Sequence, residues 1–185
     1  WVNYDIEQDA DPIRTEYDNP SYFLLGKANF FADRFILSGG VRYDDFEVEV
    51  KEGQGGTESA DDISPQLGIA YLPVDNVKLR ANYAQGFRMP SAQQLAADFV
   101  SAFGVPYVGN PDLDPEKSQT YEAGIDVFFG DLDSSLTYFH TDFEDKIVSV
   151  AGGGGVQTWD NVGEAVVSGL EAELSYDVAS LLDLS

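Results

Sequence analysis

Val77-Lys78-Leu79-Arg80-Ala81-Asn82-Tyr83 decides the fold, because apolar and polar side chains alternate along it at every position. A period of two is the period of a β-strand with one apolar and one polar face. The same alternation returns at positions 35–43, 63–71, 121–127 and 168–176. The sequence therefore predicts a chain of amphipathic strands.

Short and long connections between these strands alternate strictly. The short turns are expected at 32–34, 73–76 and 130–133, and the long loops at 52–60, 89–117 and 151–157. An up-and-down meander of an outer-membrane barrel has this layout, with tight turns at one end and long loops at the other. We predict an all-β, antiparallel up-and-down meander that forms part of a transmembrane β-barrel, with full strands near 21–31, 34–50, 62–73, 76–88, 118–129, 133–149 and 158–178 and a partial strand at 1–7.

Two local features modify this pattern. Near Asp44-Asp45 the apolar phase slips by one residue, which predicts a β-bulge or a strand end leaving the membrane. In the longest loop, Ser91 and Gln94 have the spacing of a capping box, and apolar residues follow at helical spacing up to a stop at Gly104. We expect one short helix in this extracellular loop.

Composition excludes several classes of protein. The chain of 185 residues has a net charge of −23 and only ten Lys and Arg, which argues against nucleic-acid binding. It has no Cys and no apolar run near the roughly 20 residues of a membrane helix. It starts at Trp1 without a signal peptide and ends at 181–185 in what looks like the start of a strand, so we expect a fragment.

Five segments in order resemble one family. Residues 83–91 (YAQGFRMPS), 109–116 (GNPDLDPE) and 118–125 (SQTYEAGI) are similar to consecutive segments of TonB-dependent receptors. Upstream, 37–44 (LSGGVRYD) resembles a family strand, and downstream 161–173 resembles its N-x-G-x-A…G-x-E stretch. The motif residues include Gly86, Phe87, Arg88, Pro90, Ser91, Asn110, Pro111, Leu113, Pro115 and Glu116.

The resemblance implies a function in the bacterial outer membrane. Receptors of this family have a barrel of about 22 strands around a plug domain. They import scarce nutrients such as ferric siderophores, haem or cobalamin, powered by the TonB complex. Residues 1–185 would be one partial barrel domain, without the plug and the remaining strands, and contact with TonB would run through those missing parts. No cofactor is expected.

The loop at 87–116 is the expected wall of a substrate vestibule. The candidate contacts to a small-molecule nutrient are Arg88, Gln93, Gln94, Phe99, Phe103 and Tyr107. The alternative is that Leu95, Phe99 and Phe103 only pin the loop helix to the rim. For Arg88, an ion pair with a lumen carboxylate is favoured over substrate contact.

Acidic residues gather at 44–62, where only Lys51 opposes them. A solvated rim explains them, and the sharper hypothesis is divalent cations that bridge to lipopolysaccharide or recognition of a cationic substrate. His140 is the only His, and the glycines at 152–155 lack the Lys of a phosphate cradle, so we expect no enzyme. Two other readings stay open: a small complete outer-membrane barrel, and a soluble β-rich binding module with its apolar faces packed inward.

Overall fold

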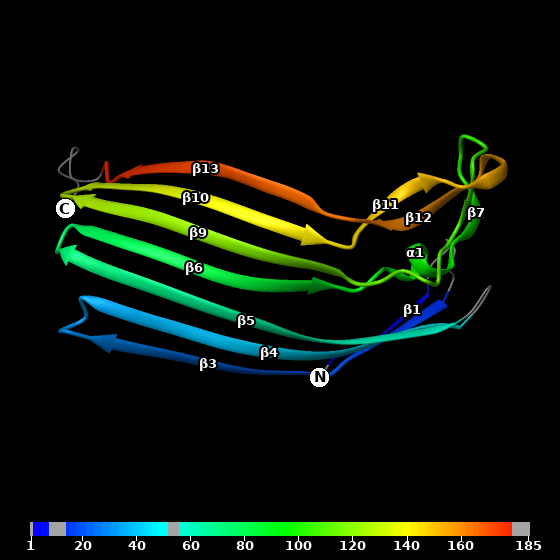
Figure 1. Ribbon diagram of the computed structural model, residues 1–185, viewed down its shortest axis with the longest axis horizontal. Helices are drawn as coiled ribbons and strands as arrows, with labels where there is room; N and C mark the ends of the chain where they lie inside the picture. Colours follow the sequence, from blue (N-terminus) through cyan, green and yellow to red (C-terminus); the bar gives the residue numbers. More distant parts are fainter. Residues whose placement is uncertain (1, 8–13, 52–55, 179–185) are drawn as a thin grey trace.

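The structure is a computed structural model that describes residues 2–7, 14–51 and 56–178. A nine-stranded antiparallel sheet dominates it (Figure 1), in the order β1-β2-β4-β5-β6-β9-β10-β13 with β3 also paired to β4. The strands are β1 (Val2–Glu7), β2 (Arg14–Asn19), β3 (Ser21–Phe30), β4 (Phe35–Val50), β5 (Thr57–Val74), β6 (Val77–Arg88), β9 (Glu116–Phe129), β10 (Leu132–Glu144) and β13 (Ala165–Tyr176).

The predicted meander is confirmed. The connections β3–β4, β5–β6 and β9–β10 are short and lie at one end of the sheet, which we call the turn end. The connections β4–β5, β6–β9 and β10–β13 lie at the other end, the loop end. The strand predicted from residue 62 starts earlier, at Thr57, so the loop expected at 52–60 is shorter.

A proline divides the first long strand. β2 and β3 pair with β4 in one continuous register, from Thr15↔Val50 to Phe30↔Phe35. Pro20 lies between them and has no N–H to give to the ladder, but its carbonyl accepts from Asp45 N–H at 3.1 Å. The sequence reading placed only β3 here and missed β2.

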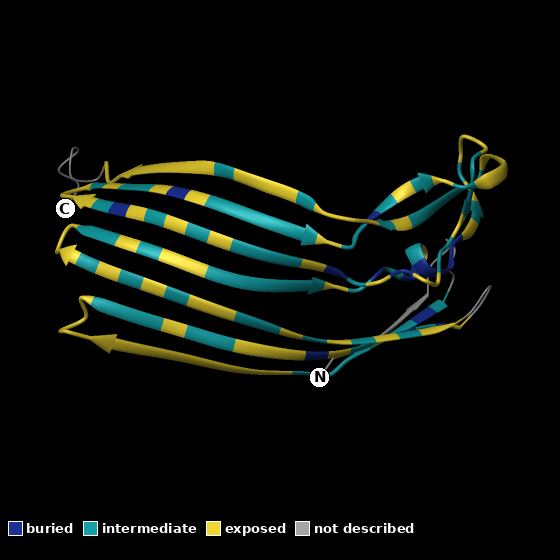
Figure 2. Cartoon of the chain, in the orientation of Figure 1, coloured by how far each residue is buried: buried dark blue, intermediate teal, exposed yellow. Residues whose placement is uncertain are grey.

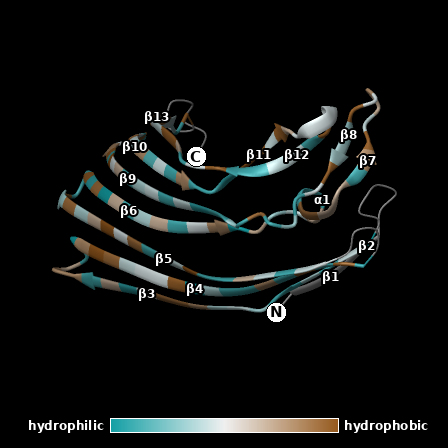
Figure 3. Cartoon of the chain, turned by 45° about the vertical axis from the view of Figure 1, so that its right-hand side comes forward, coloured by the Kyte–Doolittle hydropathy of each residue, from teal (hydrophilic) through white to brown (hydrophobic). Residues whose placement is uncertain are grey.

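The two faces of the sheet differ in chemistry. We call the face that carries the helix the inner face and the opposite one the outer face. Along the turn-end part of the strands the outer face is apolar and exposed, as at Leu79 (42%) and Leu170 (69%). The inner face there is mostly polar on the strands from β6 to β13, as at Arg80 and Glu171, while β3 also places Phe23 and Leu25 on it. In Figure 2 the alternation in burial is visible along β5 and β9, whereas β3 and β13 at the sides of the sheet are exposed along almost their whole length, and Figure 3 shows the alternation in hydropathy.

The phase slip at Asp44-Asp45 is not a bulge. β4 and β5 stay in one register from Phe35↔Tyr71 to Glu49↔Thr57. The faces exchange chemistry instead: on β4 the outer positions change from Val41 and Tyr43 to Asp45 and Glu47. The register of this sheet shifts elsewhere, between Tyr71 and Val74 at the turn end.

The inner face at the loop end becomes the core. Val48 is fully buried and Val50 is 6% exposed, and both pack against the helix α1 (Ala92–Ala96). The cluster of buried apolar residues comprises Val48, Val50, Ala92, Leu95, Ala96, Leu113 and Ile147. The apolar residues of β4 thus change sides because a folded loop covers the inner face there.

Two predicted strands are each divided in two. The segment predicted at 133–149 breaks at Asp145, whose φ of 55° ends β10, and β11 (Lys146–Ala151) follows. The segment predicted at 158–178 breaks after β12 (Gln157–Val162). β11 and β12 join β7 (Asp98–Val100) and β8 (Pro106–Val108) in a second sheet of order β11-β12-β8-β7. A turn of 3₁₀-helix, η1 (Gly153–Gly155), links β11 to β12.

The predicted loop helix is correct at its start and wrong at its end. Ser91 caps it in a complete capping box with Gln94, but the helix stops at Ala96. Residues 98–100 form β7, because Phe99 and the β-branched Val100 pair with the strand β8 instead. Gly104 is therefore a hairpin turn residue with φ of 77°.

Within the described residues no second layer covers the apolar outer face, which differs from the inward packing expected of a soluble module. Its exposed side chains include Leu24, Val41, Ile69, Tyr121, Leu136 and Leu174. Among the same residues, no helix is long and apolar enough to cross a membrane.

Candidate functional site

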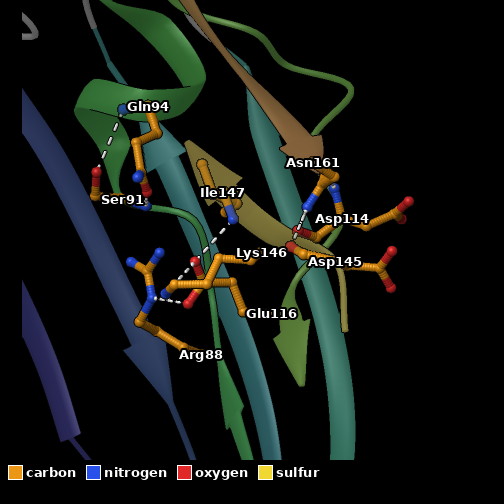
Figure 4. Close-up of polar contacts among 9 residues, drawn as sticks. All are labelled: Arg88, Ser91, Gln94, Asp114, Glu116, Asp145, Lys146, Ile147 and Asn161. Carbon is orange, nitrogen blue, oxygen red and sulfur yellow. Dashed lines mark hydrogen bonds and ion pairs between the residues drawn. The ribbon is translucent and has the colours of Figure 1, made fainter. Parts of the chain in front are cut away.

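Glu116 joins three strands at the loop end. Its carboxylate accepts from Arg88 Nε at 2.8 Å and from the backbone N–H of Ile147 at 2.8 Å, and Lys146 Nζ lies 3.5 Å away (Figure 4). Arg88 ends β6, Glu116 begins β9 and Lys146 begins β11. One carboxylate therefore fixes the second sheet to the wall of the first.

This contact controls the protonation of Glu116. The Arg88 guanidinium, helped by the Ile147 N–H, lowers the pKa of Glu116 from 4.5 to about 2 against the opposing effect of burial. The residue is only 6% exposed. Glu116 thus stays charged over the whole physiological range and keeps Arg88 paired.

Two asparagines add further ties between the sheets. Asn161 Nδ2 donates to the carbonyl oxygens of Asp114 at 2.9 Å and Asp145 at 2.6 Å, and Asn161 Oδ1 accepts from Asp114 N–H at 2.8 Å (Figure 4). Asn110 Nδ2 donates to the carbonyl of Trp159 at 3.0 Å. The loop between β6 and β9 and the loop between β10 and β13 are therefore one folded unit, which we call the loop body.

Backbone close packing completes the loop body. Gly109 N–H donates to the carbonyl of Ala97 at 2.7 Å, and Asn110 N–H donates to that of Gln94 at 2.8 Å. A Cβ on Gly109 would lie 2.5 Å from the backbone nitrogen of Ala97, so only glycine fits. Pro90 is fully buried beside the helix start.

A row of aromatic rings crosses the second sheet. The Phe99 and Tyr107 rings stack 5.1 Å apart at 5°, and the Tyr107 ring lies 5.7 Å from that of Trp159. Phe103 lies at the tip of the β7–β8 hairpin with 95% of its surface exposed. The turn that presents it is held by Gly104 N–H donating to the Ser101 carbonyl at 2.9 Å.

The predicted contact residues separate into two groups. Arg88 is held by Glu116, and Gln94 by the capping box, where its side chain accepts from Ser91 N–H at 2.9 Å. The second group is Gln93, Phe99, Phe103 and Tyr107, whose side chains are exposed or partly exposed on the loop body. Of the three residues expected to pin the helix, Leu95 does so at 4% exposure, while Phe103 points away.

Sequence reading missed Trp159. It lies on β12 in the aromatic row and packs against the core cluster. The sequence does carry a signal for it, because a tryptophan between the polar residues Thr158 and Asp160 near a long loop indicates an aromatic side chain available for contact. Its partner strand β8, however, is about fifty residues away in sequence and pairs in parallel, which no local pattern predicts.

The inner face of β6, β9 and β10 carries a charge network. Asp126 pairs with Arg80 at 3.2 Å and Lys78 at 3.0 Å, and Arg80 also donates to Ser135 and Thr137. The Arg80 guanidinium fills the space above Gly124, where a Cβ would lie 2.7 Å from Cζ. This wall is polar and ordered by ion pairs.

The acidic residues near 44–62 divide between the faces. Asp45, Glu47 and Glu49 lie on the outer face, where Lys51 pairs with Glu49 at 2.6 Å and Glu16 at 2.7 Å. No group of three or more carboxylate or His side chains suited to a metal ion occurs within the described ranges. His140 lies on the outer face, 3.1 Å from Asp142.

Comparison with known proteins identifies the fold family. The family model described as TonB dependent receptor-like, beta-barrel matches residues 2–185. The ferric enterobactin receptor of Pseudomonas aeruginosa is 30% identical over 173 residues, covering 81% of this chain and 22% of that protein. The vitamin B12 transporter BtuB of Vibrio vulnificus is 27% identical over 165 residues, covering 89% of this chain and 24% of that protein.

Solved structures show the same fold. The hemophore receptor HasR of Serratia marcescens, a double mutant in complex with its hemophore HasA and heme, superposes with a TM-score of 0.78 at 21% identity, over 91% of this chain and 33% of that one. The copper transporter OprC gives a TM-score of 0.72 at 21% identity, over 89% and 27%. The chain spans about a quarter of the length of the curated relatives it matches. This chain belongs to the TonB-dependent receptor family and forms a stretch of its β-barrel.

Proposed function

We propose that this chain is one part of the barrel wall of an outer-membrane receptor that imports a scarce nutrient, such as a ferric siderophore, haem or cobalamin, with energy from TonB. Relatives named as receptors for ferric enterobactin and hemin and as a vitamin B12 transporter support this class. Residues 1–185 would be a partial barrel domain. The plug and the contact with TonB would lie in other parts of the receptor.

The exchange of chemistry between the two faces is the observation that carries the proposal. Toward the turn end the outer face presents apolar side chains, as hydrocarbon requires. Above Tyr43 the outer face becomes acidic and the inner face becomes a packed core. A bilayer on the outside of the turn-end part, with the loop body in water above it, accounts for both changes. The acidic outer rim would then lie at lipopolysaccharide head groups.

Substrate contact falls to the exposed part of the loop body. Gln93, Phe99, Phe103 and Tyr107 are the proposed contacts, together with Trp159 at the end of the same aromatic row. Stacked rings offer flat apolar surfaces to a bulky organic ligand at low entropic cost, because neighbours already hold them. Arg88 and Gln94 would position the loop, since Glu116 and Ser91 occupy their polar groups.

Uptake by intact cells tests this function. The receptor that carries this chain is produced in a bacterial host without its own receptors for iron complexes, haem and cobalamin. Radiolabelled ferric enterobactin, haemin and cyanocobalamin are the three probes. We expect saturable uptake of one of them, and loss of that uptake when the host's TonB is deleted.

Substitutions in the aromatic row test which residues contact the substrate. Phe103→Ala and Tyr107→Ala should weaken binding of the imported probe by roughly tenfold each, as expected for exposed aromatic contacts. Phe129→Ala, an equally large exposed ring at the turn end, is the matched control and should leave binding unchanged. Uptake of none of the probes, or uptake that persists without TonB, contradicts the proposed function.

A further inference from the structure

Two adjoining cavities run along the inner face of β3 to β6. The first, about 780 Å³, opens at the loop end beside Phe23, Phe46 and Met89. The second, about 480 Å³, continues toward the turn end beside Lys27 and Asn82. Both are lined by Leu25 and Gln66, so they form one groove along the wall. We call it the β3–β6 groove.

Glycines flatten the floor of the β3–β6 groove. A Cβ on Gly68 would lie 2.6 Å from Ser38 Oγ and 2.9 Å from Asn82 Oδ1. A Cβ on Gly40 would lie 2.9 Å from Gln66 Nε2 and would also collide with the Leu25 side chain. The neighbouring side chains therefore lie down over the glycines instead of standing away from the sheet, and the wall keeps a smooth surface.

The groove carries little free charge. Its charged lining residues are Lys27, Arg42, Asp44 and Arg88. Arg42 is paired with Asp44 at 2.7 Å, and Arg88 with Glu116 at 2.8 Å. The remaining lining is aromatic, aliphatic, amide and hydroxyl, which offers many weak contacts and no strong one.

The other half of the same inner face is different. A third cavity, on β6, β9, β10 and β13, is lined by Arg80, Glu122, Ser135, Thr137, Glu171, Ala172 and Glu173. The ladder gives a direct comparison, because Gln66, Ala84, Thr120 and Thr141 are consecutive cross-strand neighbours in one row. Gln66 and Ala84 line the groove, and Thr120 and Thr141 line neither of its cavities.

We propose that the imported solute crosses the barrel along the β3–β6 groove, between this strip of wall and the plug. The inference rests on the proposed function. A passage must bind its solute weakly at several successive sites, because one strong site would hold it. The aromatic mouth, the flat glycine floor and a lining whose charges are few and mostly paired meet that need, whereas the strip that carries Glu122, Glu171 and Glu173 does not. The solute suited to it is a bulky organic molecule whose charge is shielded.

Tryptophan substitutions at matched positions test the route. In the complete receptor, Ala84→Trp and Ser38→Trp narrow the groove. Thr141→Trp adds the same bulk to the same row of the inner face outside the groove, and Ala81→Trp adds it to the outer face of β6. Binding of radiolabelled ferric enterobactin, haemin and cyanocobalamin to cells is measured in the cold, and uptake at growth temperature.

If the groove is the route, substitutions in it should lower uptake without lowering binding. Ala84→Trp and Ser38→Trp should lower uptake about tenfold with binding within about twofold of the parent, because passage and not capture is obstructed. Thr141→Trp and Ala81→Trp should leave both unchanged. Ala84→Leu adds a smaller side chain and should lower uptake in part. It provides the test if the Ala84→Trp receptor does not assemble in the membrane.

Four results overturn the proposal. Full uptake by Ala84→Trp, or equal losses in Ala84→Trp and Thr141→Trp, places the route elsewhere while the proposed function stands. Parallel loss of binding and uptake in Ala84→Trp and Ala84→Leu shows that the groove holds the plug permanently. Absence of uptake of every probe by the parent receptor removes the proposed function itself, and the route with it.

Discussion

Glu116 shows how one side chain stabilises a junction of strands. Its two oxygens on β9 are shared among the Arg88 guanidinium of β6 and the Lys146 ammonium and Ile147 N–H of β11. Removing one member leaves the buried carboxylate or its partners uncompensated, and because the Arg88 side chain is 49% exposed, the cost is below the roughly 3–5 kcal/mol of a fully buried pair. The motif residues at both ends of the loop, Arg88 and Glu116, are therefore structural partners of each other.

The pH dependence of Glu116 gives a first prediction. Its pKa is lower in the folded state, so its contribution to stability is complete above pH 4.5 and is lost as the pH falls toward about 2. Glu116→Gln should destabilise the receptor at pH 7 and remove this acid-dependent loss between those values. Heat-modifiable migration in detergent across pH measures it, with the exposed Glu144→Gln as control. An unchanged acid profile in Glu116→Gln contradicts the assignment.

Gly109 gives a second prediction. A methyl group there would meet the backbone of Ala96 and Ala97, so Gly109→Ala should displace the helix at a cost of about 1–3 kcal/mol. Gly153→Ala is the matched control, because its Cβ would meet nothing within 4 Å. Chymotrypsin should cleave Gly109→Ala faster after Phe99 and Phe103. Equal cleavage of the two variants would show that the close approach has no energetic effect.

At the scale of elements, the long strands serve two environments. The turn-end part of β4 has apolar residues outside, and its loop-end part has them inside, in one unbroken register. A strand can do this because neighbouring residues face opposite sides, so a change of one position in the apolar pattern moves burial from one face to the other.

This explains which parts of the fold were predictable from sequence. Period two located the long strands and the alternating connections, since each strand carries its own signal. The slip at Asp44-Asp45 was visible, but its cause was not, because the covering helix is distant in sequence. β7 and β8 are three residues each and β2 is set apart by Pro20, so they carry almost no periodic signal. For the candidate site, sequence located the loop and its cap, whereas the ties through Asn161 and Trp159 depend on tertiary contact.

A charge on the outer face gives a third prediction, at this scale. Leu79→Arg places a guanidinium on the apolar part of the outer face and should cost about 2–4 kcal/mol in a lipid bilayer. Glu47→Arg lies on the acidic part of the same face and should change stability by about 0.5 kcal/mol or less. Urea unfolding in lipid vesicles measures both. Equal midpoints for the two variants would mean that Leu79 does not face hydrocarbon.

At the scale of the whole molecule, the wall is divided in two directions. Along the strands, an apolar belt on the outside gives way to a packed loop body on the inside. Across the strands, the β3–β6 groove, whose few charges are mostly paired, adjoins a strip on β6, β9, β10 and β13 that is rich in carboxylates. The first division positions the chain in a membrane, and the second assigns different tasks to two parts of one inner surface.

The most direct test of this account is the polarity around spin labels on the outer face. Single nitroxides are placed at Val41 and Ile69, below the exchange of chemistry, and at Glu47 and Ser59, above it, in the receptor in lipid vesicles. We predict that the labels at Val41 and Ile69 collide mainly with dissolved oxygen, as in hydrocarbon, and those at Glu47 and Ser59 mainly with a water-soluble nickel complex. Equal access of nickel to all four labels would contradict the account, because the outer face would then have no membrane boundary.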